Sequence, residues 1–132
     1  MEGPIFLSLN HVLRLHARQI ERYGGSEGIR DTALIESAIA QPQQSFGGEY
    51  LHNGLPAMAA AYLFHIAKNH GFVDGNKRVA AAAALTFLEI NGIDTDQIDE
   101  TEMEKITIAV ADGTADKQAT TAFFVDRLNT AE

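Results

Sequence analysis

Two long apolar runs dominate the middle of the chain. Residues 55–67 (LPAMAAAYLFHIA) and residues 79–90 (VAAAAALTFLEI) both lack a clean polar stripe at helical spacing. A helix that is apolar on nearly every side is buried over most of its surface. The pattern therefore predicts a central buried hairpin of two helices, joined by a turn that contains residues 70–78 (HGFVDGNKR).

The flanking helices are amphipathic, and turn residues mark where they begin and end. In the first, apolar positions recur with the helical period at Leu9, Val12, Leu13 and Ile20. Serine and aspartate supply N-caps, whereas glycine and proline stop helices. The predicted boundaries are Ser8 and Gly24 for the first helix, Asp31 and Pro42 for the second, Pro56 at the start of the third, Asn91-Gly92 after the fourth, Asp112-Gly113 after the fifth, and Thr114 or Asp116 before a sixth that runs through Leu128.

Residues 43–53 (QQSFGGEYLHN) carry no helical period. The Gly47-Gly48 pair between Phe46 and Tyr50 predicts a short β-hairpin or flap, and a plain connecting loop is the alternative. The predicted fold is all-α: one compact domain over residues 1–132, with about six helices around the central hairpin. We expect the tyrosines Tyr50 and Tyr62 and the phenylalanines to be core residues.

Composition narrows the class of protein. The chain has 132 residues, enough for one core, and a net charge of −8 from 10 basic and 18 acidic residues. Nucleic-acid binding needs clustered cations, so no direct nucleic-acid partner is expected. No apolar run is long enough to span a bilayer, and no secretory leader is visible. With no cysteine in the chain, we expect a cytoplasmic protein.

The turn between the two apolar runs has the chemistry of a phosphate site. If a helix begins near Asn76, the free N–H groups of its first turn attract an anion. Lys77 and Arg78 fall in that same turn, where each cation is disfavoured by up to ~1 kcal/mol unless an anion binds. Gly75 permits close approach of the backbone to a ligand. The combination favours phosphate.

Three other residues of the turn suggest catalysis. Asp74 offers one carboxylate, which suits Mg²⁺ that takes its other ligands from phosphates and water. His70 is placed to take a proton from an attacking hydroxyl, and Phe72 is expected to anchor the loop in the core. Each residue also has a structural alternative: Asp74 as an N-cap, His70 as a partner of the helix dipole, and the two cations as solvated charges. His16 and His65 are expected to be buried, hydrogen-bonded histidines.

The nine residues HGFVDGNKR resemble the signature of the Fic/Doc (Fido) superfamily, and their GNKR ending is closest to the death-on-curing (Doc) toxin branch. Residues 22–42 (RYGGSEGIRDTALIESAIAQP) are similar to the opening of Doc-like proteins. The resemblance covers most of the chain and fails only in the last third. It implies that His70 is the base, that Asp74 holds Mg²⁺, and that Phe72 positions the loop. The residues that it implies for phosphate binding are Gly75, Asn76, Lys77 and Arg78.

The resemblance also implies an activity. AMP-transferases of the superfamily carry HxFx[DE]GNGRxxR, whereas this chain has Lys77 for the second glycine and Ala81 for the second arginine. Both departures match the Doc branch, which transfers the γ-phosphate of ATP to a threonine of elongation factor Tu. There are two alternatives to this kinase activity. The protein transfers AMP to a protein target, or it is a helical binding module without catalysis.

Two partners follow from the same resemblance. No inhibitory [ST]xxxE[GN] helix is present. Thr32 and Glu36 have the spacing of this motif, but Ser37 stands where it requires Gly or Asn. A separate antitoxin is therefore expected, with its C-terminal segment in a groove near the active site. In Fic/Doc relatives, the segment that matches residues 43–53 is a flap beside the active site that holds a target peptide as an added strand. The flap residues implied here are Phe46, Gly47, Gly48, Glu49 and Tyr50.

Overall fold

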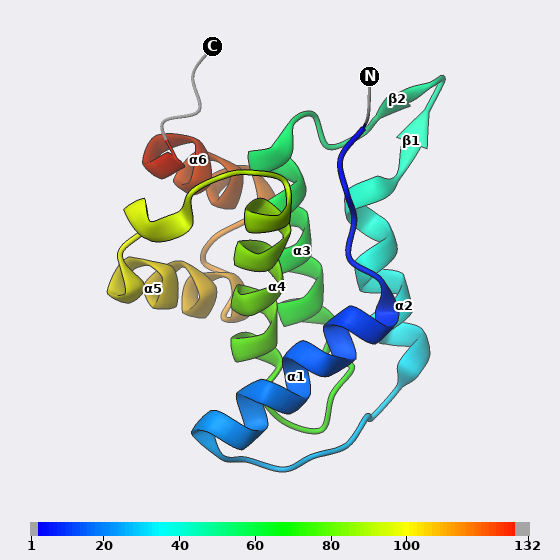
Figure 1. The fold of residues 1–132 in the computed structure, drawn as a ribbon, viewed down its shortest axis with the longest axis vertical. Helices are drawn as coiled ribbons and strands as arrows, with labels where there is room; N and C mark the ends of the chain where they lie inside the picture. Colours follow the sequence, from blue (N-terminus) through cyan, green and yellow to red (C-terminus); the bar gives the residue numbers. More distant parts are fainter. Residues whose placement is uncertain (1–2, 129–132) are drawn as a thin grey trace.

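The computed structural model describes residues 3–128, which form helices and one small hairpin (Figure 1). Within this part of the chain, the predicted all-α architecture of six helices is confirmed. The elements are α1 (Leu9–Tyr23), α2 (Thr32–Ala40), the 3₁₀ helix η1 (Gln41–Gln43), β1 (Ser45–Phe46), β2 (Glu49–Tyr50), α3 (Leu55–Asn69), α4 (Asn76–Ile90), the 3₁₀ helix η2 (Thr95–Gln97), α5 (Glu100–Ala111) and α6 (Lys117–Leu128).

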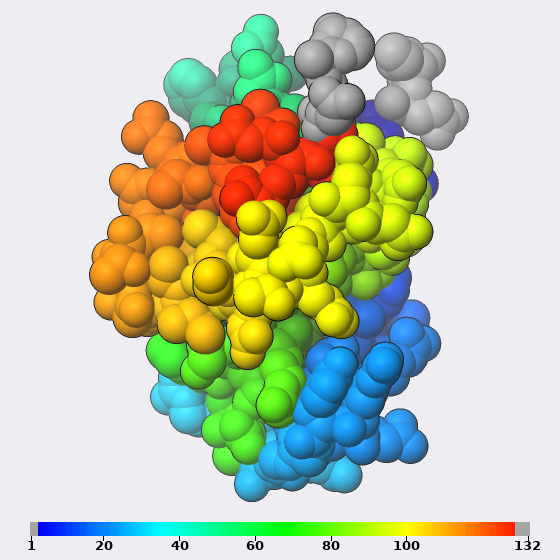
Figure 2. All heavy atoms as spheres, turned by 90° about the vertical axis from the view of Figure 1, so that its left-hand side faces the viewer, coloured from blue at the N-terminus to red at the C-terminus, as the bar shows by residue number. Residues whose placement is uncertain are grey.

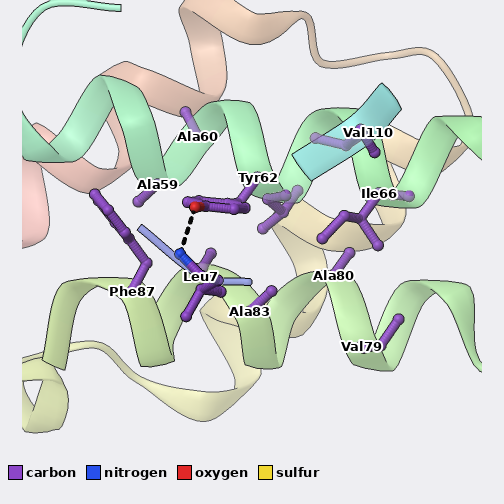
Figure 3. Packing of buried hydrophobic residues seen from close by; sticks show 14 of the residues in the cluster. Leu7, Ala59, Ala60, Tyr62, Ile66, Val79, Ala80, Ala83, Phe87 and Val110 are labelled. Carbon is purple, nitrogen blue, oxygen red and sulfur yellow. Dashed lines mark hydrogen bonds between the residues drawn. The ribbon is translucent and has the colours of Figure 1, made fainter. Parts of the chain in front are cut away.

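Helices α3 and α4 form the predicted central hairpin and run antiparallel through the middle of the molecule (Figure 1). Small side chains line the contact between them. Ala59 of α3 and Ala80 and Ala83 of α4 are fully buried, and Figure 3 shows them between the two helices. Alanine has a small side chain and the highest helix propensity. The two backbones therefore approach closely without loss of helix stability.

A buried tyrosine at the middle of α3 packs between the two helices of this hairpin. The Tyr62 ring lies 5.1 Å from the Phe87 ring, centroid to centroid, and its hydroxyl accepts a hydrogen bond of 2.9 Å from the Leu7 N–H (Figure 3). Burial raises the pKa of Tyr62 to about 12, so the phenol stays neutral. The extended segment before α1 is thereby fixed to the middle of the hairpin.

The other helices cover the hairpin on two sides. Helices α1 and α2 pack on one side and α5 and α6 on the other (Figure 1). Their starts follow the predicted caps: Ser8 accepts from the His11 N–H at 3.1 Å, Asp31 from the Ala33 N–H at 3.0 Å, and Asp116 from the Ala119 N–H at 2.8 Å. None of the helices among residues 3–128 is long and apolar enough to cross a membrane.

The hairpin of β1 and β2 projects beyond the N-terminal end of α3 (Figure 1). It forms where the glycine pair predicted it, with Gly47 and Gly48 at positive φ. The expectation that Phe46 and Tyr50 are core residues is wrong, since Phe46 is 81% exposed and Tyr50 is 42% exposed. The hairpin lies outside the core, and an edge contact with Phe6 shields the Tyr50 ring in part.

A lysine joins α6 to α3 and to the segment before it. Lys117 Nζ donates to His65 Nε2 at 2.8 Å and to His52 Nε2 at 3.1 Å. Burial, followed by the charge of Lys117, lowers the pKa of His65 to about 4 and also lowers the pKa of His52. Both imidazoles are therefore neutral acceptors at neutral pH.

This cluster predicts that the protein loses stability in mild acid. Unfolded His65 binds a proton below a pKa of 6.5, whereas folded His65 does so only below about 4. The unfolded state thus binds more protons in this window, and the free energy of unfolding falls as the pH drops. Because the cluster is partly hydrated, we expect a loss of roughly 1–2 kcal/mol. Urea unfolding at several pH values measures it. An equally steep fall in His65→Gln would contradict the assignment.

Candidate functional site

The turn between α3 and α4 is closed by one asparagine side chain. Asn76, the first residue of α4, accepts from the Phe72 N–H through Oδ1 and donates to the Phe72 carbonyl through Nδ2, both at 3.0 Å. Phe72 itself is buried, with 2% of its surface exposed. The turn is therefore anchored both by its apolar side chain and by its own main chain. The Asn76 side chain thus spends one Nδ2 hydrogen on the turn itself, and its main-chain N–H lies in the first turn of α4.

A second segment, residues 24–31, runs beside the turn and supplies further hydrogen bonds to it. The Gly71 carbonyl accepts from the N–H groups of Arg30 and Asp31, at 2.8 and 3.0 Å. The Val73 N–H donates to the Gly28 carbonyl at 3.1 Å. The loop after α1 and the turn thus pair as two short extended strands, which fixes the position of the turn relative to α1 and α2.

His70 ends α3 in a left-handed conformation. Its φ is 54°, and it is the one non-glycine residue with positive φ among residues 3–128. Its carbonyl accepts from Arg30 Nε at 2.7 Å, which holds the main chain in this conformation. A non-glycine residue in this region costs ~1–3 kcal/mol and is typical of functional sites. The side chain is exposed and faces the groove described below.

The Asp74 carboxylate is held by two main-chain donors. The Ser26 N–H donates to Oδ2 at 3.0 Å, and the Gly75 N–H donates to Oδ1 at 2.8 Å. These two bonds, with a smaller contribution from Arg78, keep the pKa of Asp74 below its usual value of 3.8. The carboxylate is therefore charged, exposed and fixed in direction, as a ligand of Mg²⁺ would need to be.

Gly75, rather than Asp74, is the N-cap of α4, with φ 79° and ψ 16°. The Val79 N–H already donates to the Gly75 carbonyl at 3.0 Å. The N–H groups of Asn76, Lys77 and Arg78 are those of the first turn, which have no acceptor within a helix. They point out of the helix end together with its positive dipole, the arrangement that binds phosphate.

These groups face a groove of about 820 Å³, which lies within the ~300–1,000 Å³ range of small-molecule sites. Its walls come from the end of α1, from the turn and the start of α4, and from α5. Figure 2 shows the face where these three segments meet, in light blue, green and yellow. One wall carries Lys77 and Arg78, and the α5 wall carries Glu100 and Glu104. The groove has room for a nucleotide beside the exposed Asp74 carboxylate, so the residues present fit bound Mg²⁺ and ATP.

The expectation that the flap lies beside the motif is not met. The hairpin joins the N-terminal end of α3, whereas the turn follows its C-terminal end (Figure 1). A helix of 15 residues is roughly 22 Å long, and the four residues 51–54 between hairpin and helix do not bridge that distance. None of the flap residues Phe46, Gly47, Gly48, Glu49 and Tyr50 lines the groove.

Several residues of the site were not picked out from the sequence. Tyr23 lines the groove, and its ring lies 4.8 Å below the Arg78 guanidinium. Ser26 and Arg30 hold Asp74 and His70 as described. The similarity of residues 22–42 to Doc-like openings could have drawn attention to all three. The α5 wall has no comparable motif.

The fold and the groove define a helical domain whose central hairpin carries a cationic helix N-terminus and an exposed carboxylate at the turn between two buried helices. Comparison with known sequences then gives its family. The model of the Fic/Doc family matches residues 6–88, which include the turn and both helices of the central hairpin. The chain belongs to the Fic/Doc family.

Two relatives are similar over 71 and 107 residues. The chain is 48% identical over 71 residues to a protein named "Toxin Doc" from Mycolicibacterium smegmatis, which covers 54% of this chain and 55% of that protein. It is 35% identical over 107 residues to "Protein kinase doc" from Escherichia phage P1, which covers 81% of this chain and 82% of that protein. The chain thus spans about half the length of the first relative and most of the second.

Packing around Gly25 gives a test of how Asp74 is held. A Cβ at Gly25 would lie 2.7 Å from Asp74 Oδ2, whereas a Cβ at Gly24 would meet nothing within 4 Å. Both glycines have positive φ, so both alanine variants carry backbone strain. We expect Gly25→Ala to displace the carboxylate from the Ser26 N–H and to raise the Asp74 pKa toward 3.8.

The measurement is a pH titration of the Asp74 carboxyl carbon by NMR. Gly24→Ala is the matched control and should leave the Asp74 pKa low. Equal titration curves in the two variants would contradict the role of the Ser26 hydrogen bond.

Proposed function

We propose that this protein transfers the γ-phosphate of ATP to a serine or threonine hydroxyl of a protein target. The observation that carries the proposal is the convergence of a base candidate, a fixed carboxylate and a cationic helix N-terminus on one groove. Phosphoryl transfer requires mainly positioning and neutralisation of charge, which these groups supply. The name of the relative from Escherichia phage P1, "Protein kinase doc", supports the same class of reaction.

Each residue then has one task. His70, exposed at the groove, accepts the proton of the attacking hydroxyl. The N–H groups at the start of α4, together with Lys77 and Arg78, bind the phosphates. Asp74 would hold Mg²⁺, which supplies neutralisation of charge on the phosphate oxygens. Phe72 keeps the turn seated in the core.

The groove favours phosphoryl transfer over AMP transfer. Ala81, which stands where AMP-transferases of the superfamily have an arginine, lines the groove one turn beyond Arg78. A methyl group there offers no bidentate clamp for a second phosphate. Lys77, in place of a glycine, adds charge at the helix end, where the terminal and most highly charged phosphate would bind.

We further propose that the protein is the toxin of a toxin–antitoxin pair, as the name of the Mycolicibacterium relative suggests. A cognate antitoxin would place its C-terminal segment in a groove near the active site. Elongation factor Tu is the proposed target, which would put the activity in the cytoplasm. Because the hairpin lies far from the turn, the proposed step does not use the flap.

Intact mass spectrometry of the target tests the proposal. The protein is incubated with Mg²⁺, ATP and purified elongation factor Tu. Phosphate adds about 80 Da to the target and AMP adds about 329 Da, from the composition of the transferred groups. We expect the smaller increment, with release of ADP. The larger increment with pyrophosphate would assign the chain to AMP transfer, and no increment would favour a binding module or another target.

His70→Asn separates the catalytic role of His70 from its conformation. Asparagine tolerates the left-handed φ of 54° better than alanine does, but it cannot act as a base. We expect the rate of transfer to fall by roughly 10²–10⁴-fold with the melting temperature nearly unchanged. Single-turnover kinetics with labelled ATP measures the rate. A variant as active as the wild type would remove His70 from the mechanism.

A further inference from the structure

We infer that His16 is a positioning residue of the active site, a role that rests on the proposed function of the turn. His16 lies in the middle of α1, and only 6% of its surface is exposed. Its Nε2 lies 2.7 Å from the main-chain carbonyl oxygen of Asp74. A carbonyl oxygen only accepts hydrogen bonds, so Nε2 carries the hydrogen and donates it.

The ring of His16 also supports the residue that anchors the turn. It stacks on Phe72 with 3.9 Å between ring centroids and 10° between ring planes. The contact places an imidazole face directly under the aromatic ring that seats the turn in the core. His16 therefore contacts the turn at two places: the ring of Phe72 and the main chain of Asp74, the candidate metal ligand.

Gly75 completes the enclosure of the ring. A Cβ added to Gly75 would lie 3.5 Å from His16 Nε2 and 3.2 Å from Ile20 Cδ1. The left-handed glycine thus packs its backbone against the same α1 surface. Phe72, Asp74 and Gly75 all rest on one histidine, on the side of the turn away from the groove.

The geometry assigns two anchors to Asp74. His16 fixes its carbonyl from the buried side, and the Ser26 and Gly75 N–H groups fix its carboxylate from the exposed side. Without the first anchor, the buried carbonyl loses its donor and the peptide can rotate, so the carboxylate direction is no longer set. Binding that depends on the carboxylate should suffer more than phosphate binding at the helix end, whose N–H groups belong to α4 itself.

The test compares two variants of nearly equal shape. Gln and Met are both unbranched, but only Gln keeps an N–H donor for the Asp74 carbonyl. His16→Met should weaken binding of Mg²⁺-ATP by roughly 5- to 30-fold, the effect of one buried hydrogen bond, whereas His16→Gln should restore much of it. Binding of metal-free pyrophosphate should change little in either variant. Isothermal calorimetry measures both ligands.

A matched control removes a different buried hydrogen bond. Tyr62→Phe deletes the bond that the Leu7 N–H donates at the middle of α3, outside the groove. It should lower the melting temperature by an amount similar to that of His16→Met, yet leave Mg²⁺-ATP binding unchanged. If His16→Met does not fold, His16→Phe takes its place. Phenylalanine keeps a ring stacked on Phe72 and also lacks the hydrogen-bond donor.

Amide hydrogen exchange gives a readout that does not depend on nucleotide binding. The Ser26 and Gly75 amides report on the Asp74 carboxylate that they bind, and both should exchange faster in His16→Met than in His16→Gln or Tyr62→Phe. Unchanged exchange at both amides would overturn the inference and leave His16 as a core residue. If the wild type binds no Mg²⁺-ATP, the proposed function fails, and the exchange rates still decide whether His16 positions Asp74.

Discussion

The site depends on how the main chain of one turn is satisfied. Residues 70–75 leave α3 and enter α4 without a regular structure of their own, so their buried polar groups need partners. Asn76 supplies two hydrogen bonds to Phe72, and the loop after α1 supplies those to Gly71 and Val73. Asn76 belongs to α4 and the loop joins α1 to α2, so the turn is held between packed helices, and His70, Asp74, Lys77 and Arg78 line one groove.

The alanine-rich hairpin makes that arrangement rigid. Close packing of α3 against α4, with Ala59, Ala80 and Ala83 fully buried, sets the distance between the two helix ends that the turn joins. The aromatic residues Tyr62 and Phe87 pack together between the two helices, away from the turn. The buried contact of the helices is thus the core, and the turn that joins them carries the candidate site.

Residues in locally unfavourable conformations or positions lie at the turn between α3 and α4. His70 has a left-handed φ, and Lys77 and Arg78 lie at the positive end of a helix dipole in a chain whose net charge is −8. Such conflicts with local preference are typical of functional positions, where the rest of the fold compensates for them. Here Arg30 holds the His70 carbonyl and the Tyr23 ring accepts the Arg78 guanidinium, which reduces both costs.

The sequence alone predicted the six helices, the N-caps Ser8, Asp31 and Asp116, and residues 70–78 as a candidate phosphate site, because apolar period and capping residues act over a few neighbouring positions. It could not determine contacts between distant segments: His16 and Asp74 are 58 positions apart, and no local pattern links them. For the same reason it missed that the Asn76 side chain closes the turn and that Phe46 and Tyr50 are exposed. Tertiary structure also decided the position of the β-hairpin, since the direct connection to the start of α3 keeps it a helix length away from the turn.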